Sequence, residues 1–301
     1  MRVDIWYSFL PSNTTIFAES GYVAYTGVGN PTNIIPSVAG QKHYRPQMRF
    51  TVQAAGKTDV GRVRANNEDN FGYDVDCQVF VLCDGMGGEA AGEIASSLTV
   101  NKILAYFRDG RFPVEAQPED EDLPESARLL RSAIRVANQA VYKEASANPE
   151  HTGMGTTVVA VLFGEDSFAV AHLGDSRLYR VRGDAIEQLT NDHSVVMEQV
   201  RRGLLTIEEA GRSQMQNLIT RALGLRESVE PELGSHPVHA GDLLLLCSDG
   251  FSRFVPEKKT LELLAQSKDL QQCCDSLVEA AKELGSDDNI TCVLVRVLAE
   301  S

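Results

Sequence analysis

The chain has 301 residues, of which 43% are hydrophobic, enough for at least one folded domain with a full core. It carries 42 acidic and 28 basic residues, a formal net charge of −14, and no local basic patch, so nucleic acid is excluded as an expected partner. No apolar run reaches the roughly 18 residues of a membrane span, and the N-terminal stretch IWYSFL lacks the flanks of a secretory signal.

The six cysteines include no C-x-x-C pair, and three of them lie inside apolar runs. Thiols in such runs behave as small core residues, and this usage indicates a reducing compartment. We therefore expect a cytoplasmic protein with no membrane partner, and we expect it to be a monomer.

Residues 1–48 differ in composition from the rest of the chain. They are rich in Ser, Thr, Asn, Gly, Pro and Tyr, with few charges and no sustained periodicity. We expect a flexible or irregular N-terminal extension, followed by a single domain over residues 49–301. An alternative is that translation begins at Met48, where the sequence MRFTVQAAGKTD looks like a natural domain start.

Strand and helix signals alternate in the first half of this domain. The apolar run VFVLC, residues 79–83, indicates a buried strand, and residues 89–110 have the composition of a helix. A second helix is expected between Pro124 and Pro149. Its apolar residues recur at the spacing of one helical face: Leu130, Ile134, Ala137 and Val141.

The second half continues this alternation. Residues 156–163 and 167–173 indicate two strands joined by a GED turn, and residues 242–247 and 290–297 indicate two more. Residues 190–224 are polar and mixed, which suggests a helical excursion from the core. Another amphipathic helix precedes the last strand, ended by a glycine: Leu270, Cys274, Leu277, Ala281, Leu284 and Gly285. The pattern alone predicts one α/β domain of about 250 residues.

Four aspartates stand at the edges of four of these strands. Asp84, Asp175 and Asp249 follow strands, and Asp288 precedes the last one. One Asp beside a Gly after a strand is usually only a turn, but four together favour a shared site if the strands pack side by side. Such a cluster of like charges repels itself, and divalent cations with oxygen ligands are the usual resolution.

Glycines flank three of these aspartates, and the types of residue at these positions indicate which ion would bind. Gly85, Gly174 and Gly250 allow sharp turns that bring backbone carbonyl oxygens within reach of a cation. No His or Cys occupies these positions, which favours magnesium or manganese over zinc.

Six segments resemble a known family in order and spacing. GKTDVGRVRANNEDNF, VFVLCDGMGG, GMGTTVVAVLF, AHLGDSRLYRVR, LLLLCSDGF and GSDDNITCVLV are similar to the motifs of the metal-dependent protein phosphatases of the PPM family, the type 2C serine/threonine phosphatases, and particularly of the bacterial branch. The resemblance covers about residues 56 to 298. It implies an α+β fold, a four-layer α-β-β-α sandwich of two antiparallel sheets with a binuclear metal site at one end.

The resemblance also implies the principal metal ligands. Asp84 would bridge two Mn²⁺ or Mg²⁺ ions, and the carbonyl of Gly85 would contact the second. Asp249 and Asp288 would complete the coordination of the first ion.

Four further positions match the family motifs. Glu68 and Asp69 would hold the second ion through bound water, and Asp175 with Asp249 resembles the pair that binds a third ion in bacterial members. Arg64 matches the arginine that grips the substrate phosphate, although in any other sequence a surface salt bridge would be the default interpretation.

These expectations agree with a known chemistry. Two cations about 4 Å apart lower the pKa of a water that attacks phosphorus in line, and Arg64 helps to neutralise the phosphoryl oxygens. The expected activity is hydrolysis of phosphoserine and phosphothreonine on proteins, opposing a bacterial serine/threonine kinase. Asn289 is expected only to orient its neighbours, and residues 190–224 align with the mobile flap of the family, which we expect to influence substrate choice.

Some residues depart from the family pattern or fall outside it. Met86 stands where many eukaryotic relatives carry a proposed general acid, and His193 is a weak substitute that we interpret as a solvated loop residue. Arg253 replaces a third-metal carboxylate of eukaryotic relatives. His236 and His239 have H-x-x-H spacing but are expected in a turn before a strand.

Two alternative functions stay open. One is a catalytically silent phosphatase fold that serves as a binding or regulatory module, which predicts the loss of metal ligands. The other is a phosphatase of a small phosphoserine regulatory domain, although the relatives with that role usually carry sensor domains, for which residues 1–48 are too short.

Overall fold

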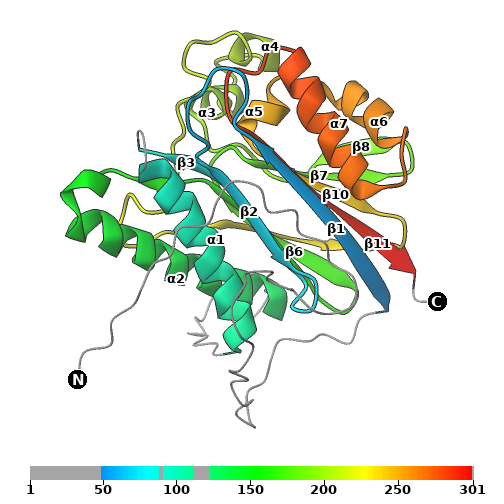
Figure 1. Cartoon of the computed structure of the whole chain (residues 1–301), viewed down its shortest axis with the longest axis horizontal. Helices are drawn as coiled ribbons and strands as arrows, with labels where there is room; N and C mark the ends of the chain where they lie inside the picture. The colour runs from blue at the N-terminus through cyan, green and yellow to red at the C-terminus, as the bar shows by residue number, and fades with distance from the viewer. Residues whose placement is uncertain (1–48, 88–90, 111–122, 300–301) are drawn as a thin grey trace, which may run out of the picture. The chain divides into compact units, whose positions relative to one another are not determined.

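The computed structural model describes residues 49–87, 91–110 and 123–299. The predicted N-terminal extension, residues 1–48, lies outside the described residues. From residue 49 onward, two antiparallel sheets pack face to face with helices on both outer sides (Figure 1). This confirms the predicted α-β-β-α sandwich. No helix in the described ranges has both the length and the apolarity to cross a membrane.

The first sheet joins the two ends of the domain. Its strand order is β1-β11-β10-β7-β8, and β1 pairs with β11 along its whole length. Strand β1 has a mixed sequence in which Phe50, Val52 and Ala55 are buried and the other side chains are exposed or half-buried, which is why no apolar run marked it. The strands are β1 (Phe50–Asp59), β7 (Arg177–Arg182), β8 (Ala185–Gln188), β10 (Leu243–Cys247) and β11 (Ile290–Ala299).

The second sheet has the order β2-β3-β5-β6-β9, with the short strand β4 paired to the end of β3. All of its pairings are antiparallel. The α/β class that the alternation of strands and helices predicted by itself, which usually has a parallel sheet, is therefore wrong. The strands are β2 (Asp69–Asp74), β3 (Val79–Met86), β4 (Gly155–Thr156), β5 (Val158–Phe163), β6 (Ser167–Leu173) and β9 (Glu232–Pro237).

The predicted long helices are present. Helix α2 begins after Pro124 and buries the predicted apolar face, and α7 is capped at its N-terminus by Asp269, whose side chain accepts the Gln272 N–H at 2.8 Å. The helices are α1 (Ala91–Asp109), α2 (Glu125–Ala147), the 3₁₀ turn η2 (Pro149–His151), α3 (Val195–Arg201), α4 (Ile207–Ala210), α5 (Asp249–Ser252), α6 (Glu257–Leu264) and α7 (Leu270–Glu283).

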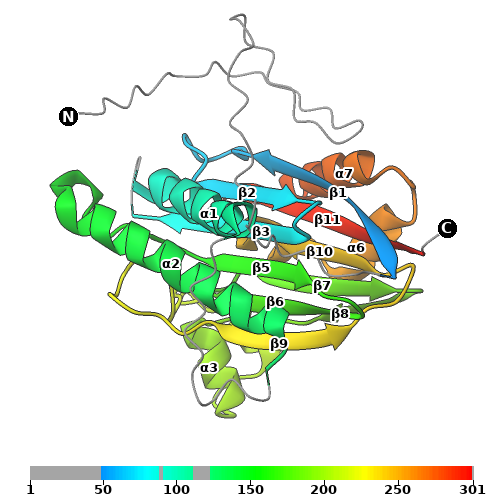
Figure 2. The same ribbon diagram turned by 90° about the horizontal axis from the view of Figure 1, so that it is seen from below.

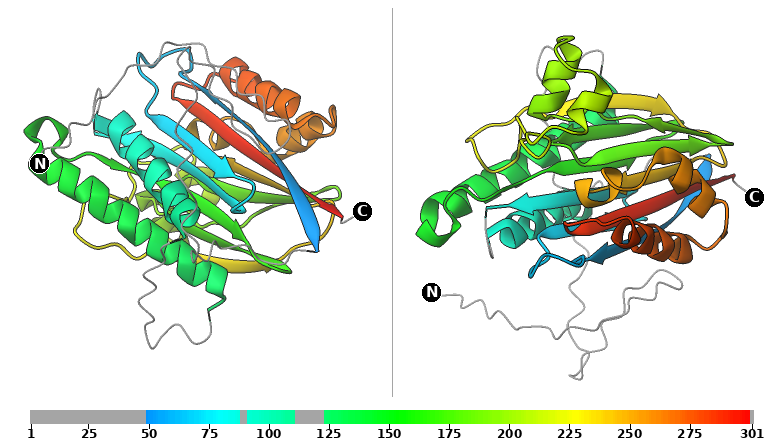
Figure 3. Two further views of the ribbon diagram at one scale, coloured as in Figure 1. Left: turned by 60° about the horizontal axis from the view of Figure 1, so that its bottom comes forward. Right: turned by 90° about the horizontal axis from the view of Figure 1, so that it is seen from above.

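Three apolar layers hold the sandwich together. One lies between the six-stranded sheet and helices α1 and α2 (Figure 2), and another lies between the five-stranded sheet and helices α6 and α7 (Figure 3). The third fills the space between the sheets, where Phe50 of β1 in one sheet packs edge-to-face on Phe163 of β5 in the other, with ring centroids 5.6 Å apart. Such close aromatic packing fixes how the two sheets sit on one another.

Antiparallel registry brings particular strand ends to one edge. In the five-stranded sheet, Cys247 at the end of β10 pairs with both Cys292 near the start of β11 and Arg177 at the start of β7. In the six-stranded sheet, Leu173 at the end of β6 pairs with Val158 at the start of β5. The aspartate near the end of β3 and those that follow β6 and β10 therefore share an edge with the one that precedes β11.

Candidate metal centre

Five aspartates meet at this edge, contributed by both sheets. Asp84 lies near the end of β3, directly opposite Asp69 at the start of β2. Loss of solvation raises the pKa of Asp84 well above its usual range, and the negative charges of four other aspartates raise it further. Those four are Asp69, Asp249, Asp175 and Asp288. The structure therefore brings together the four strand-end aspartates of the sequence prediction, with Asp69, which the family resemblance also implied, as their immediate neighbour.

Asp69 is held from the opposite sheet. Its Oδ2 accepts hydrogen bonds from Ser248 Oγ at 2.8 Å and from Thr291 Oγ1 at 2.7 Å. Burial raises the pKa of Asp69 to about 7, and the charges of Asp249 and Asp288 act in the same direction against these hydrogen bonds. Its Oδ1 is buried with no hydrogen-bond partner in the described part of the chain.

Asp249 and Asp175 are also buried carboxylates close to other negative charges. Asp249 is 9% exposed, and its Oδ2 accepts from Arg253 Nη1 at 3.1 Å, while its Oδ1 is buried with no partner among the described residues. Burial and the charge of Asp249 raise the pKa of Asp175 to about 8, with a further contribution from Asp192. Buried oxygens without a donor are costly, and here they face like charges.

Divalent cations fit this arrangement. The donors are carboxylate oxygens, and two of them lack any other partner among the described residues. The five carboxylates also carry more negative charge than the guanidinium groups of Arg253 and Arg64, which contact Asp249 and Asp288, can offset. Hard cations such as Mg²⁺ and Mn²⁺ prefer such an oxygen set, whereas zinc sites are usually built from His and Cys.

Backbone packing around Gly85 brings Glu68 to the same edge. The Gly85 N–H donates to the Glu68 carbonyl at 3.1 Å, and a Cβ at Gly85 would lie 2.1 Å from the carbonyl oxygen of Gly92 in α1. A Cβ at Gly92 would in turn lie 2.7 Å from the Glu68 carboxylate. Two glycines are thus needed for α1 to approach this carboxylate, and the sequence interpretation missed Gly92, whose only signal was the glycine cluster before the helix.

Arg64 lies at the rim of the cluster. Its Nη2 donates to Asp288 Oδ2 at 2.8 Å, and its side chain is 52% exposed. The Asn289 side chain holds the loop that carries Arg64, because its amide donates to the carbonyls of Val60 and Asn66 and its oxygen accepts the Glu68 N–H. These contacts agree with the orienting role expected for Asn289.

Two threonines position Asp84, and their role was not predicted. The hydroxyl of Thr157 accepts the Asp84 N–H at 3.0 Å, and the hydroxyl of Thr156 donates to the Asp84 carbonyl at 2.9 Å. Thr157 Oγ1 also shares a hydrogen bond of 2.7 Å with Ser176 Oγ, beside Asp175. The motif GMGTT was recognised, but only the folded chain reveals that its hydroxyls link two of the aspartates.

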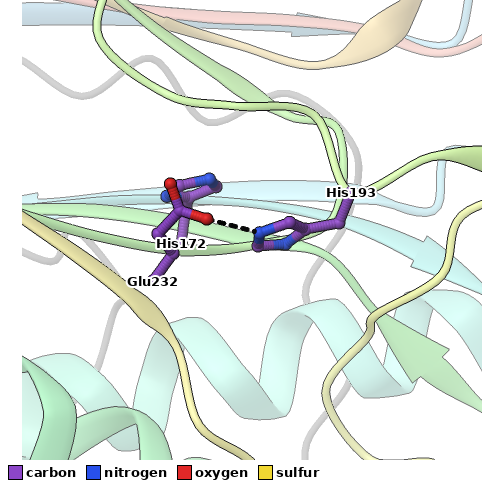
Figure 4. Close-up of side chains that lie close together, drawn as sticks. All are labelled: His172, His193 and Glu232. Carbon is purple, nitrogen blue, oxygen red and sulfur yellow. Dashed lines mark hydrogen bonds and ion pairs between the residues drawn. The ribbon is translucent and has the colours of Figure 1, made fainter. Parts of the chain in front are cut away.

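Two expectations about histidines are wrong. His193 is only 2% exposed, because its ring stacks on His172 and bonds to Glu232, so it is not a solvated loop residue (Figure 4). His236 belongs to strand β9, where it pairs with Phe168, and not to a turn before a strand. In both instances the partners are distant in sequence.

The three residues of Figure 4 are joined by the hydrogen bond between His193 and Glu232 and by the stacking of the two imidazole rings, and they are not a convergent metal site. Their possible ligand atoms lie within 4.8 Å of one another. The rings of His172 and His193, however, are stacked with centroids 4.7 Å apart and planes 8° apart. Imidazole lone pairs lie in the ring plane, so stacked parallel rings cannot both direct a nitrogen to one ion at about 2.0 Å.

A cavity of about 220 Å³ lies beside the aspartates. Asp175, Arg177, Asp249 and Arg253 line it together with Ile207 of helix α4 and other residues from 190–224. The segment predicted as a flap therefore borders the same space as two of the clustered carboxylates.

Comparisons with known proteins agree with this geometry. A family model described as protein phosphatase 2C matches residues 61–294. The chain is 35% identical over 247 residues to the serine/threonine phosphatase stp of Listeria innocua, covering 81% of this chain and 95% of that protein. It is 37% identical over 252 residues to the serine/threonine protein phosphatase PstP of Mycobacterium tuberculosis, covering 84% of this chain and 46% of that protein.

Solved structures give the same result. The serine/threonine phosphatase Stp1 of Staphylococcus aureus superimposes with a TM-score of 0.74 at 33% identity, covering 86% of this chain and all of that one. The catalytic domain of PstP in complex with two manganese ions superimposes with a TM-score of 0.71 at 36% identity, covering 83% of this chain and 99% of that one. The chain belongs to the protein phosphatase 2C family of serine/threonine phosphatases, on its bacterial branch.

Proposed function

We propose that this protein hydrolyses phosphoserine and phosphothreonine on other proteins, with Mn²⁺ or Mg²⁺ ions held by the aspartate cluster. The observation that carries the proposal is the meeting of five aspartates at one edge, with two buried carboxylate oxygens unpartnered among the described residues. The related catalytic domain of PstP, crystallised in complex with two manganese ions, supports the choice of metal.

Each of the predicted site residues has a part in this proposal. Asp84, the carbonyl of Gly85, Asp249 and Asp288 would hold two ions, with Glu68 and Asp69 supporting the second through water. Asp175 and Asp249 would hold a third. When bound, the ions would lower the pKa of water and neutralise phosphoryl oxygens.

The chain's own residues bind and orient the substrate. Arg64 donates one N–H to Asp288, and its remaining donors are available to the oxygens of a phosphate at the exposed rim. His193 does not serve as the general acid, because its two ring nitrogens are engaged by Gly174 and Glu232.

Several further statements belong to the proposal. Residues 49–301 would form the phosphatase domain with 190–224 as its flap, and its substrates would be those of a serine/threonine kinase. We place the protein in the cytoplasm because all six cysteines, which lie in the described ranges, are free and buried. A silent binding module is not favoured, since the expected ligands of the two ions are all present and the relatives are named phosphatases.

Phosphate release from phosphoserine and phosphothreonine peptides tests the function. We expect activity with added Mn²⁺, none with a chelator, and none in Asp249→Asn. Asp166→Asn is the matched control, because Asp166 is exposed in the turn between β5 and β6, at the far end of β6 from Asp175. Wild-type protein that leaves phosphopeptides untouched in excess Mn²⁺ would favour the silent module.

A further inference from the structure

The cluster of His172, His193 and Glu232 holds the start of the segment 190–224. His172 in β6 and Glu232 in β9 are directly paired across the sheet. His172 Nε2 donates to the carbonyl of Asn191 at 3.0 Å, and Glu232 Oε1 accepts from the Asn191 amide at 2.8 Å. The imidazole of His193 stacks on that of His172 (Figure 4). Two strands of the sandwich thus anchor the first residues of the flap.

The position of the proton on His193 follows from its partners. The Gly174 N–H can only donate, so His193 Nδ1, at 3.2 Å, must present its lone pair. The single proton of the neutral ring is then on Nε2, where it is donated to Glu232 Oε2 at 3.1 Å. Burial lowers the pKa of His193, which keeps the ring neutral. Glu232 therefore selects the tautomer that can hold Gly174.

His193 contacts both backbone polar groups of Gly174. Its ring accepts the Gly174 N–H, and its own backbone N–H donates to the Gly174 carbonyl at 2.9 Å. Its carbonyl accepts the N–H of Thr220, so the returning end of the flap segment is fastened to the same residue. Both ends of the segment therefore meet at the peptide that precedes Asp175.

The neighbours of Asp175 are fixed on both sides. Gly174 has φ +105°, and a Cβ there would lie 2.6 Å from Thr157 Cγ2. Ser176 is bonded to Thr157, and the Arg177 guanidinium holds Asp192, next to His193, with contacts of 2.7 to 3.2 Å. Among residues 174–177, Gly174 differs in that its backbone N–H is held by an imidazole nitrogen, that of His193.

We propose that His193 is a positioning residue that acts through the Gly174 peptide to fix the carboxylate of Asp175, and that it fastens the flap to the metal centre. The role rests on the proposed function only in that Asp175 binds a cation. The acceptor at the Nδ1 position of residue 193 fixes the position of the Gly174 backbone, and the contact to Glu232 orients that acceptor.

Two conservative variants separate the two ring nitrogens. In His193→Asn the side-chain oxygen can occupy the Nδ1 position and still accept the Gly174 N–H, while the Glu232 contact is lost. In His193→Gln the longer amide can reach Glu232, while the acceptor for Gly174 is lost. Both variants remove the imidazole, so they control for one another.

Two readouts need no phosphatase activity. Hydrogen exchange measures the protection of the Gly174 N–H, and titration calorimetry measures Mn²⁺ binding, with Asp175→Asn identifying the part of the isotherm that depends on Asp175. We expect His193→Gln to speed Gly174 exchange and to raise that Mn²⁺ dissociation constant about 10-fold, the lower end for residues that orient ligands. His193→Asn should stay within about 3-fold of the wild type in both, well short of that effect.

Equal behaviour of the two variants, whether both like the wild type or both impaired, would overturn the proposal. If His193→Gln does not fold, His193→Asn still decides, because wild-type Mn²⁺ affinity supports the role and a loss of about 10-fold refutes it. An inactive wild type that nevertheless shows the expected difference in exchange would refute the proposed function and leave the positioning role standing.

Discussion

Two clusters of titratable groups, each with buried members, lie next to each other in this protein, and their charges are met in opposite ways. In the histidine cluster, Glu232 receives two donors, and the rings of His172 and His193 are kept neutral by burial. In the aspartate cluster, five carboxylates repel one another, and two buried oxygens lack partners in the described ranges.

The way in which each cluster balances its charge indicates its role. Hydrogen bonds from within the chain engage both ring nitrogens of His193 and both carboxylate oxygens of Glu232, and only the uncharged Nδ1 of His172 is left without a partner among the described residues. The histidine cluster therefore needs no added charge and can serve as a fixed anchor. The aspartate cluster is incomplete without added positive charge, and its cost is compatible with folding only if cations or protons supply that charge.

The largest expected effect concerns Asp84. Asp84→Asn should lower kcat by about 10³-fold or more, since it removes a carboxylate proposed to hold the ions. In chelator the same variant should melt at a higher temperature than the wild type, because one repelling charge is gone. Phosphate release and thermal unfolding measure the two effects. A metal-free variant that melts below the wild type would mean that Asp84 is already satisfied within the protein.

The second prediction concerns how the free energy of unfolding depends on pH. The metal-free protein and the Mn²⁺-bound protein should show opposite trends. Asp69 and Asp175 have folded pKa values of about 7 and about 8, above the ordinary 3.8. Their stabilising effect is complete below the ordinary value and is lost as the pH rises through 7 to 8.

Urea unfolding in chelator from about pH 5 to about pH 9 should therefore show a falling free energy of unfolding, by at most about 1.4 kcal/mol per pH unit for each group. With excess Mn²⁺ the free energy of unfolding should rise over the same range, because deprotonated carboxylates bind the ion better. A flat profile in chelator would contradict the repulsion inferred for this cluster.

The third prediction tests the link between the clusters. Gly174→Ala should lower the free energy of unfolding by about 3 kcal/mol, because it combines an unfavourable positive φ with a clash against Thr157. Gly183→Ala is the control: φ is +59° there and a Cβ meets nothing within 4 Å, so only a backbone cost of about 1 kcal/mol is expected. Equal losses in urea unfolding would show that the contact with Thr157 is unimportant.

The smallest expected effect concerns Arg64 at the exposed rim. Arg64→Ala should raise KM for a phosphopeptide about 10-fold while leaving Mn²⁺ affinity within about 3-fold, since the guanidinium is proposed to bind phosphate and not the ions. Steady-state kinetics and calorimetry separate these quantities. A large loss of Mn²⁺ affinity with unchanged KM would instead assign Arg64 to holding Asp288.

The sequence predicted the parts of the fold that carry a strong local pattern. The apolar runs indicated strands β3, β5, β6, β10 and β11, and helical periodicity indicated α2 and α7. Strands β1 and β9 were not predicted from the sequence, because their side chains are mixed and partly exposed and their pairing depends on partners far along the chain. The antiparallel pairing itself came from the family resemblance and not from the alternation of elements.

The candidate site shows the same division. Asp84, Asp175, Asp249 and Asp288 could be found because each stands beside an apolar strand. The contacts that complete the site could not: Ser248 and Thr291 bind Asp69 from the other sheet, and His193 finds Glu232 39 residues away. A short polar segment such as TNDHS contains no sign that its histidine will be buried.

The most direct test is the anomalous difference density of a crystal soaked in Mn²⁺. We expect at least two Mn²⁺ peaks contacted by oxygens of Asp84, Asp249 and Asp288, and no such peak beside His172, His193 and Glu232. Well-ordered aspartate side chains with no Mn²⁺ between them would contradict this expectation.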